Sequence, residues 1–297
     1  MTLTVRRLGK SFAAEVRGLD LRQSIDKETF SELYDLFLSY GVLVLPGQAV
    51  SVDQHLAFAS HFGEIWTLPV DDPSKLRVKN AAIDDVSNLD TKGEIAGTNS
   101  EKYMFALGNQ LWHSDLSFRD VPAQASLLHA EEIALVGGET EFADLIAAYD
   151  ALSEDMRTKI DGLIAKHSLL HSRQRMGYNK ITDEQRAKFP PAFQPLARVH
   201  PDTGKKNLYI GAHAFAVEGL PDEEGQALLD QLLKFATEDR FVYRHRWAVY
   251  DLVIWDNRRA LHRGRPYDAD RERRVMHRVT IQGKGKTVQN GQIIAGM

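Results

Sequence analysis

Short segments with the composition of β-strands dominate the last third of the chain, and this pattern restricts the possible folds most strongly. Residues 241–247, 251–255 and 273–282 are rich in β-branched and aromatic side chains. A doubly wound fold would instead alternate each strand with a helix. The pattern therefore predicts a mainly β protein with inserted helices, in the form of a β-sandwich or jelly roll.

Capping residues and apolar periodicity predict the remaining elements. Asp26 can cap a helix that Gly41 ends, and Ser51 with Gln54 forms a capping box. Helices are predicted over residues 27–40, 51–62, 144–151, 153–166 and 221–237. Strands are predicted over residues 42–45, 126–130, 196–200 and 208–211, the last two as a hairpin.

The composition excludes several classes of protein. The chain of 297 residues has no cysteine, which excludes disulfide scaffolds, zinc–thiolate sites and thiol nucleophiles. The net charge of −4 does not suggest a nucleic-acid partner, and no apolar run reaches the ~18 residues of a membrane span. No linker or internal repeat is found. We expect one cytoplasmic domain over residues 1–297.

Residues 84–108 form a long polar stretch that contains three glycines and has no clear period. A loop of this length is usually functional or disordered. It leads directly into the segment that contains His113, so it is a candidate lid over an active site. An ordinary mobile surface loop would have the same composition. The tail over residues 283–297 is polar and glycine-rich and is left unassigned.

His113 and Asp115 are separated by one residue. In a strand, side chains two residues apart lie on the same face, so this imidazole and carboxylate can reach one point. A further histidine would complete the two-histidine, one-carboxylate set that holds iron(II) and leaves positions open for a co-substrate and oxygen. Ser117 continues the alternation and is predicted to point into the same cavity. A His-x-Asp pattern also occurs by chance, so alone it is a weak signal.

Residues 274–280 alternate in the manner of a strand and place Arg274 and Arg278 on one face. This face could be a charged solvent face. Alternatively it lines the mouth of the fold, where two arginines would bind two carboxylates. His262 lies between an apolar strand and this segment, which favours a role as the third metal ligand. Of the other histidines, only His213, just beyond a strand end, is a further site candidate.

Several motifs occur together in one order along nearly the whole chain. They are residues 109–115, 137–140, 255–258 and 274–278, together with His262. In these motifs the chain resembles the taurine dioxygenase/TfdA family of 2-oxoglutarate oxygenases. Residues 210–213, 217–221 and 241–247 are most similar to the 2,4-dichlorophenoxyacetate dioxygenase branch of that family.

The resemblance implies a double-stranded β-helix, the cupin-like jelly roll of these enzymes. It implies that iron(II) is held by His113, Asp115 and His262. It further implies that the distal carboxylate of the co-substrate 2-oxoglutarate is held by Thr140 and Arg274. The substrate contacts that we expect are Asn109, Ser117, His213 and Arg278.

The resemblance also implies a reaction. The enzyme would use O2 to hydroxylate the carbon next to the carboxylate of an aryloxyacetate, which cleaves the ether to a phenol and glyoxylate, with succinate and CO2 as co-products. We expect a small acidic substrate and a homo-oligomer. Residues 66–70 and 210–213 differ from the taurine enzyme, and residues 64–100 do not match the herbicide branch closely. An alkylsulfonate or sulfate-ester dioxygenase and a non-catalytic jelly-roll binding protein therefore stay open as alternatives.

Overall fold

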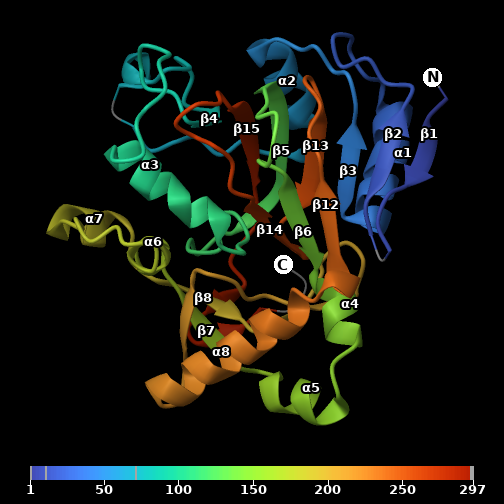
Figure 1. Cartoon of the computed structure of the whole chain (residues 1–297). Coiled ribbons are helices and arrows are strands. Elements are labelled where there is room, and N and C mark those ends of the chain that lie inside the picture. Colours follow the sequence, from blue (N-terminus) through green and yellow to red (C-terminus); the bar gives the residue numbers. More distant parts are fainter. Residues whose placement is uncertain (1, 11, 71, 295–297) are drawn as a thin grey trace.

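A seven-stranded sheet forms the larger half of the core in the computed structural model, which describes residues 2–10, 12–70 and 72–294 (Figure 1). Its strand order is β1-β2-β3-β13-β5-β15-β4, and only β2 and β3 pair in parallel. The strands are β1 (Thr4–Arg7), β2 (Ala14–Arg17), β3 (Val42–Leu45), β4 (Asp84–Ser87), β5 (Ala123–Glu132), β13 (Leu252–Asp256) and β15 (Val275–Gln282).

A smaller sheet packs against the larger one. It has the order β12 (Val242–His245), β6 (Thr140–Asp144) and β14 (Ala260–Gly264), and an isolated bridge adds His113 beside His262 of β14. Buried side chains from both sheets, among them Phe142 and Trp255, form the layer between them. From β12 to β15 the chain passes alternately between the smaller and the larger sheet, which is the winding of a jelly roll.

Two helices cover the outer face of the larger sheet through the apolar positions that the sequence predicts. In α1 (Lys27–Tyr40), Asp26 accepts a hydrogen bond from the Thr29 amide, and Gly41 ends the helix in the left-handed conformation. In α2 (Val52–Ala59), which continues into η1 (Ser60–Phe62), the predicted capping box is present. Leu33 and Phe37 pack in one cluster with Leu127 and Ile281 of the sheet.

A third apolar cluster lies at the other end of the sandwich, where α8 crosses below β7 and β8 in Figure 1. The helices are α4 (Leu145–Asp150), α5 (Glu154–Ile160), α6 (Leu169–Gln174), α7 (Asp183–Lys188) and α8 (Asp222–Ala236), with the one-turn η4 (Asp239–Phe241). The strands are β7 (Ile164–His167), β8 (Ala192–Pro195), β11 (Ala214–Val217) and the predicted hairpin of β9 (Ala197–Val199) and β10 (Lys206–Leu208).

Two expectations need correction. Residues 84–108 are not one irregular loop, because the stretch begins with β4, which pairs with β15, and ends in α3 (Glu101–Ala106) and the first turn of η3 (Leu107–Gln110). The helix predicted over 153–166 ends at Ile160, since Gly162 has a positive φ and the chain then enters β7.

The tail contains a small hairpin of β16 (Val288–Gln289) and β17 (Gln292–Ile293), while residues 295–297 lie outside the described residues. A one-turn helix, η2 (Pro73–Lys75), precedes β4. Among the described helices, none is both long and apolar enough to cross a membrane.

Candidate active site

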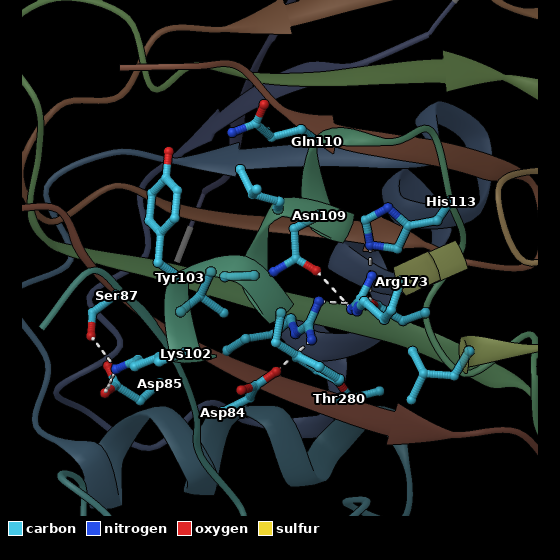
Figure 2. A pocket seen from close by; sticks show the side chains of 18 of the residues that line it. Asp84, Asp85, Ser87, Lys102, Tyr103, Asn109, Gln110, His113, Arg173 and Thr280 are labelled. Atoms are coloured by element: carbon cyan, nitrogen blue, oxygen red, sulfur yellow. Dashed lines mark hydrogen bonds and ion pairs between the residues drawn. The ribbon is translucent and has the colours of Figure 1, made fainter. Parts of the chain in front are cut away.

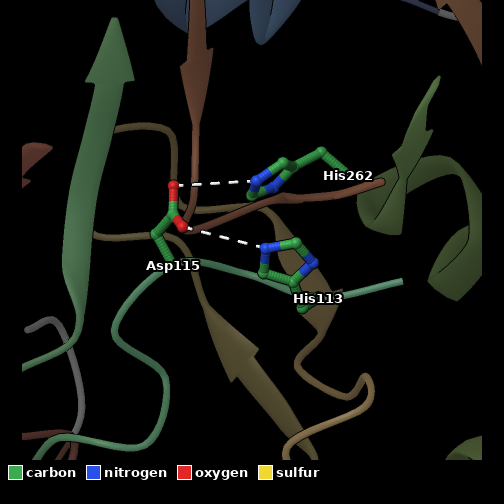
Figure 3. Close-up of side chains that lie close together, drawn as sticks. All are labelled: His113, Asp115 and His262. Carbon is green, nitrogen blue, oxygen red and sulfur yellow. Dashed lines mark ion pairs between the residues drawn. The ribbon is translucent and has the colours of Figure 1, made fainter. Parts of the chain in front are cut away.

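Asp115 and His113, which are neighbours in the sequence, meet the remote His262 at the open edge of the smaller sheet (Figure 3). His113 Nε2 lies 3.9 Å from Asp115 Oδ1, and His262 Nε2 lies 3.7 Å from Asp115 Oδ2. Two ligand atoms that are each ~2.1 Å from one ion lie at most ~4.2 Å apart. Both distances meet this limit, so the three predicted ligands are brought together in an arrangement that fits one metal ion.

The two histidines are cross-strand neighbours held by their own backbones. The His113 amide donates to His262 O at 3.0 Å, and the His262 amide donates to His113 O at 2.8 Å. The His113 side chain is fixed as well, because its Nδ1 lies 2.7 Å from Leu111 O. A carbonyl can only accept, so Nδ1 carries the proton and Nε2 keeps a free lone pair toward Asp115.

Asp115 is held by a buried network from the two sheets. Ser126 Oγ on β5 donates to Asp115 Oδ2 at 2.7 Å, and Asn257 Oδ1 accepts from the Asp115 amide at 3.0 Å. Asn257 in turn donates to Ser126 Oγ at 2.9 Å and accepts from the Trp255 indole at 3.0 Å. Ser126 and Asn257 were not predicted as site residues, although Asn257 stands in one of the family motifs.

The protonation states suit a metal ion. Burial lowers the pKa of His113 to about 4, and burial together with the neighbouring His113 lowers the pKa of His262 well below its usual value. Burial alone would raise the pKa of Asp115, but Arg278, the two neighbouring histidines and the Ser126 hydrogen bond together outweigh it and bring this pKa to about 2. Near neutral pH the set therefore offers two neutral imidazoles and a carboxylate, which metal binding requires. This nitrogen and oxygen donor set suits iron(II).

The predicted position of Ser117 is wrong. Leu116 has a φ of +53°, so the strand-like alternation ends directly after Asp115. The Ser117 hydroxyl instead lies 3.1 Å from His167 Nδ1, and Ser117 does not line the cavity described below. A left-handed leucine is rare, and nothing in the local sequence indicates it.

A cavity of about 600 Å³ opens beside the triad (Figure 2). His113 and Asp115 lie in its wall, and the inner face of β15 contributes Arg278 and Thr280. Residues 102–110 form another side, which is the position expected of a lid. The aromatic side chains of the wall are Trp66, Tyr103, Phe105, Phe118, Tyr178, Phe189 and Tyr267.

Arg274, directly before β15, and Arg278 within it both face inward, so the solvent-face alternative is wrong. Arg278 Nη1 donates to Asp115 Oδ1 at 2.6 Å, and its Nη2 donates to Asp84 on β4. Arg274 is 9% exposed, lines the same cavity and donates to Gly138 O at 3.3 Å. Asn88 accepts a hydrogen bond from the Arg274 amide, which ties the end of β4 to this arginine.

The other predicted contacts are placed as follows. Thr140 is buried at the start of β6, where its hydroxyl accepts from the Trp247 indole at 3.0 Å, and it does not line the cavity wall. Asn109 and His213 both line the cavity, and the His213 ring lies 5.7 Å from the His113 ring. Arg173 also lines it, although no sequence pattern indicated this residue.

Residues 4–280 match the family model described as taurine catabolism dioxygenase TauD, TfdA family. The chain belongs to the TauD/TfdA family. It is 43% identical to the alpha-ketoglutarate-dependent 2,4-dichlorophenoxyacetate dioxygenase of Cupriavidus pinatubonensis, over 95% of this chain and 98% of that one. It is 36% identical to the (S)-phenoxypropionate/alpha-ketoglutarate-dioxygenase of Sphingobium herbicidovorans, over 91% of this chain and 92% of that one.

A crystal structure of AAD-2 in complex with Mn(II) and N-oxalylglycine aligns with this TauD/TfdA chain with a TM-score of 0.91. The sequences are 40% identical, and the alignment covers 98% of this chain and 100% of that one. These matches confirm the jelly-roll fold and the reaction class. The chain is a 2-oxoglutarate-dependent dioxygenase that uses iron(II). The matched proteins are named as dioxygenases, so the comparisons do not support the alternative of a non-catalytic binding protein.

Proposed function

We propose that this enzyme hydroxylates aryloxyacetates such as 2,4-dichlorophenoxyacetate at the carbon next to the carboxylate. The observation that carries this proposal is a cavity that combines aromatic walls with buried arginines directly beside the triad. A flat ring with an acidic side chain matches these two kinds of surface. The matches to enzymes named for 2,4-dichlorophenoxyacetate and phenoxypropionate support the same substrate class.

We assign iron(II) to His113, Asp115 and His262. When bound, iron(II) with 2-oxoglutarate and O2 supplies the oxidation of a C–H bond to C–OH, with succinate and CO2 formed from 2-oxoglutarate. Arg274 would pair with the distal carboxylate of 2-oxoglutarate, since its guanidinium is buried and donates only to a backbone carbonyl among the described residues. Thr140 would assist from the start of β6, two residues after the carbonyl that Arg274 contacts.

The remaining residues would position the substrate. Arg278 lines the cavity, and its guanidinium donates a hydrogen bond to Asp115 of the triad. His213 and Asn109 also line the cavity and would contact the substrate there. With the acid group fixed there, the adjacent carbon is held beside the triad, and positioning is the main task left to the protein. The hydroxylated product is a hemiacetal, which collapses to a phenol and glyoxylate.

We further propose that residues 84–108 act as a lid. Phe105 and Tyr103 belong to the cavity wall, so movement of α3 would open the cavity to solvent. A closed lid excludes water from the reacting carbon and strengthens the electrostatic contacts inside. Lys102 holds α3 to the β4 side through Asp85 and Ser87, each at 3.3 Å, as Figure 2 shows.

The test is an assay with the enzyme reconstituted anaerobically with Fe(II) and 2-oxoglutarate and started with O2. Succinate and phenol are followed with 2,4-dichlorophenoxyacetate as substrate and with taurine in parallel. Phenol formed in step with succinate is the expected result. Succinate in step with sulfite from taurine alone would move the assignment to the alkylsulfonate alternative. Absence of phenol with every aryloxyacetate tested would contradict the proposed substrate class.

A further inference from the structure

Arg173 presents a buried positive charge that the proposed roles do not use. It lies on α6 and is 6% exposed. Its Nη2 donates to Asn109 Oδ1 at 3.2 Å, whereas its Nε and Nη1 have no hydrogen-bond partner. The guanidinium lies over the Phe105 ring, 4.7 Å from its centre. Among the described residues, the guanidinium of Arg173 therefore has only one neutral amide oxygen as a hydrogen-bond partner and one aromatic face as a cation–π partner.

Arg278 and Arg274, which also line the cavity, differ from Arg173 in having an acidic partner or a proposed one. Arg278 pairs with both Asp115 and Asp84, and Arg274 has the proposed 2-oxoglutarate carboxylate. For Arg173, no carboxylate of the described residues lies within ion-pair distance. Burying a cation with unfilled donors costs several kcal/mol, and such a cost is recovered when an anion binds. This asymmetry points to a missing anion rather than to a structural ion pair.

The position of Arg173 relates it to the reacting centre. Figure 2 shows Asn109 directed toward Arg173, on the side of the cavity where His113 lies. His113, Arg173 and Arg278 all line this one cavity. Burial, followed by repulsion from Arg278, lowers the pKa of Arg173 to about 10. The side chain therefore stays charged at neutral pH.

We propose that Arg173 binds the carboxylate of the acidic substrate from the α6 side and supplies the charge that neutralises it. The proposal rests on the proposed aryloxyacetate function and deepens it. Arg278 contributes donors to the same carboxylate, but its own charge is already balanced by Asp84 and Asp115. An acid that enters the cavity thus gains electrostatic attraction from Arg173, whose charge no carboxylate of the described residues balances. The same contact links the substrate to Asn109 and Phe105, which belong to the wall formed by α3 and η3.

Gly108 offers a way to displace this charge without removing it. A Cβ atom added at Gly108 would lie 1.7 Å from Arg173 Nη1. Gly108 has no positive φ, so alanine fits its backbone. The contact is with the end of a flexible side chain, so Gly108→Ala should shift the guanidinium and leave the fold intact. Arg175 at the end of α6 is exposed and provides a matched control for loss of an arginine.

The experiment measures binding to enzyme loaded with Mn(II) and N-oxalylglycine, so that no turnover occurs. The two probes are 2,4-dichlorophenoxyacetate and its neutral alcohol, 2-(2,4-dichlorophenoxy)ethanol, titrated calorimetrically into wild type, Arg173→Met, Arg173→Lys, Gly108→Ala and Arg175→Met. We expect Arg173→Met to weaken binding of the acid by about 10- to 100-fold and to leave the alcohol unchanged. Arg173→Lys and Gly108→Ala should fall between, and Arg175→Met should match wild type.

Equal weakening of the acid and the alcohol by Arg173→Met would overturn the proposal, because Arg173 would then only shape the cavity. Unchanged binding of the acid would overturn it as well. A selective loss of N-oxalylglycine affinity would assign Arg173 to the co-substrate instead. If wild type itself does not bind the acid, the proposed function fails together with this inference, which separates that case from a failure of Arg173 alone.

Discussion

Asn257 shows how much of the site depends on residues behind the ligands. Its side chain contacts the Asp115 amide, Ser126 and Trp255 at once, so it fixes the carboxylate from the buried side. Removing such a supporting group typically costs about 10- to 100-fold in metal affinity or activity. We therefore expect Asn257→Ala to weaken Mn(II) binding by about this factor. Exposed Asn179 supplies the control substitution, and equal metal affinity in both variants would contradict the proposed support.

The roles proposed for Arg278 and Arg274 predict opposite effects on the KM values of the two substrates. We expect Arg278→Ala to raise KM for the acidic substrate about tenfold or more and to change KM for 2-oxoglutarate much less. Arg274→Ala should show the reverse, because it would lose the distal carboxylate of the co-substrate. Steady-state kinetics with each substrate varied in turn measures both KM values in each variant. The opposite pattern would mean that the two roles are exchanged.

His55 and His167 predict how stability depends on pH. Burial lowers the pKa of each to about 3, from an ordinary value of 6.5 in the unfolded chain. Between these values the unfolded state binds more protons than the folded state, so the free energy of unfolding falls as pH drops from about 6.5 to about 4. Each such histidine contributes about 1.4 kcal/mol per pH unit.

The measurement is chemical denaturation at several pH values in this window. His55→Leu should reduce the slope of the free energy of unfolding against pH by the contribution of one proton. His61→Leu, at an exposed position, should leave this slope unchanged. An identical slope in His55→Leu and wild type would show that the pKa of His55 is not lowered in the folded protein.

At the level of elements, the alternation within β15 was sufficient to predict which side chains face the cavity. The period of a strand is intrinsic to its geometry, and β15 keeps it through Arg278 and Thr280. The same rule was wrong for Ser117, since the left-handed Leu116 ends the extended segment. Arg173 could not be predicted, because α6 has only six residues and the role of this side chain depends on contacts with Asn109 and Phe105.

The segment from β4 to α3 could not be predicted either. Asp84 and Asp85 are polar, yet β4 is a strand because it pairs with the edge of β15. Such pairing is decided by the partner strand and not by local composition. A polar sequence therefore conceals an element that supplies Asp84 and Asn88 to the site.

The contact of Lys102 with the β4 side predicts the behaviour of the lid. Its ammonium group donates to Asp85, Ser87 and the Leu89 carbonyl. We expect Lys102→Ala to speed amide hydrogen exchange in residues 90–106 about tenfold, since a charged hydrogen bond of this kind is lost. Lys92→Ala, at an exposed position in the same segment, is the control. Unaltered exchange would indicate that apolar packing alone holds α3.

For the whole molecule, we propose that residues 1–297 form one domain. The two sheets share one apolar layer, and the third cluster is continuous with the smaller sheet through Ala143 and Leu261. We expect a single cooperative unfolding transition by calorimetry. Mn(II) with N-oxalylglycine at a hundred times the Kd should add about 2.7 kcal/mol of stability. Two separate transitions, only one of them shifted by the ligands, would contradict a single domain. The predicted homo-oligomer stays a prediction that light scattering can check.

The backbone bridge between His113 and His262 has a consequence for biosynthesis. Ser114 and Ala260 beside it, also hydrogen-bonded, are 146 residues apart in the chain. Pairing over such a separation forms late, because a long loop must close first. A nascent or truncated chain that lacks β14 would hold at most two of the three proposed ligands. Acquisition of iron would then report that synthesis has passed β14, and shorter chains would not carry a redox-active metal.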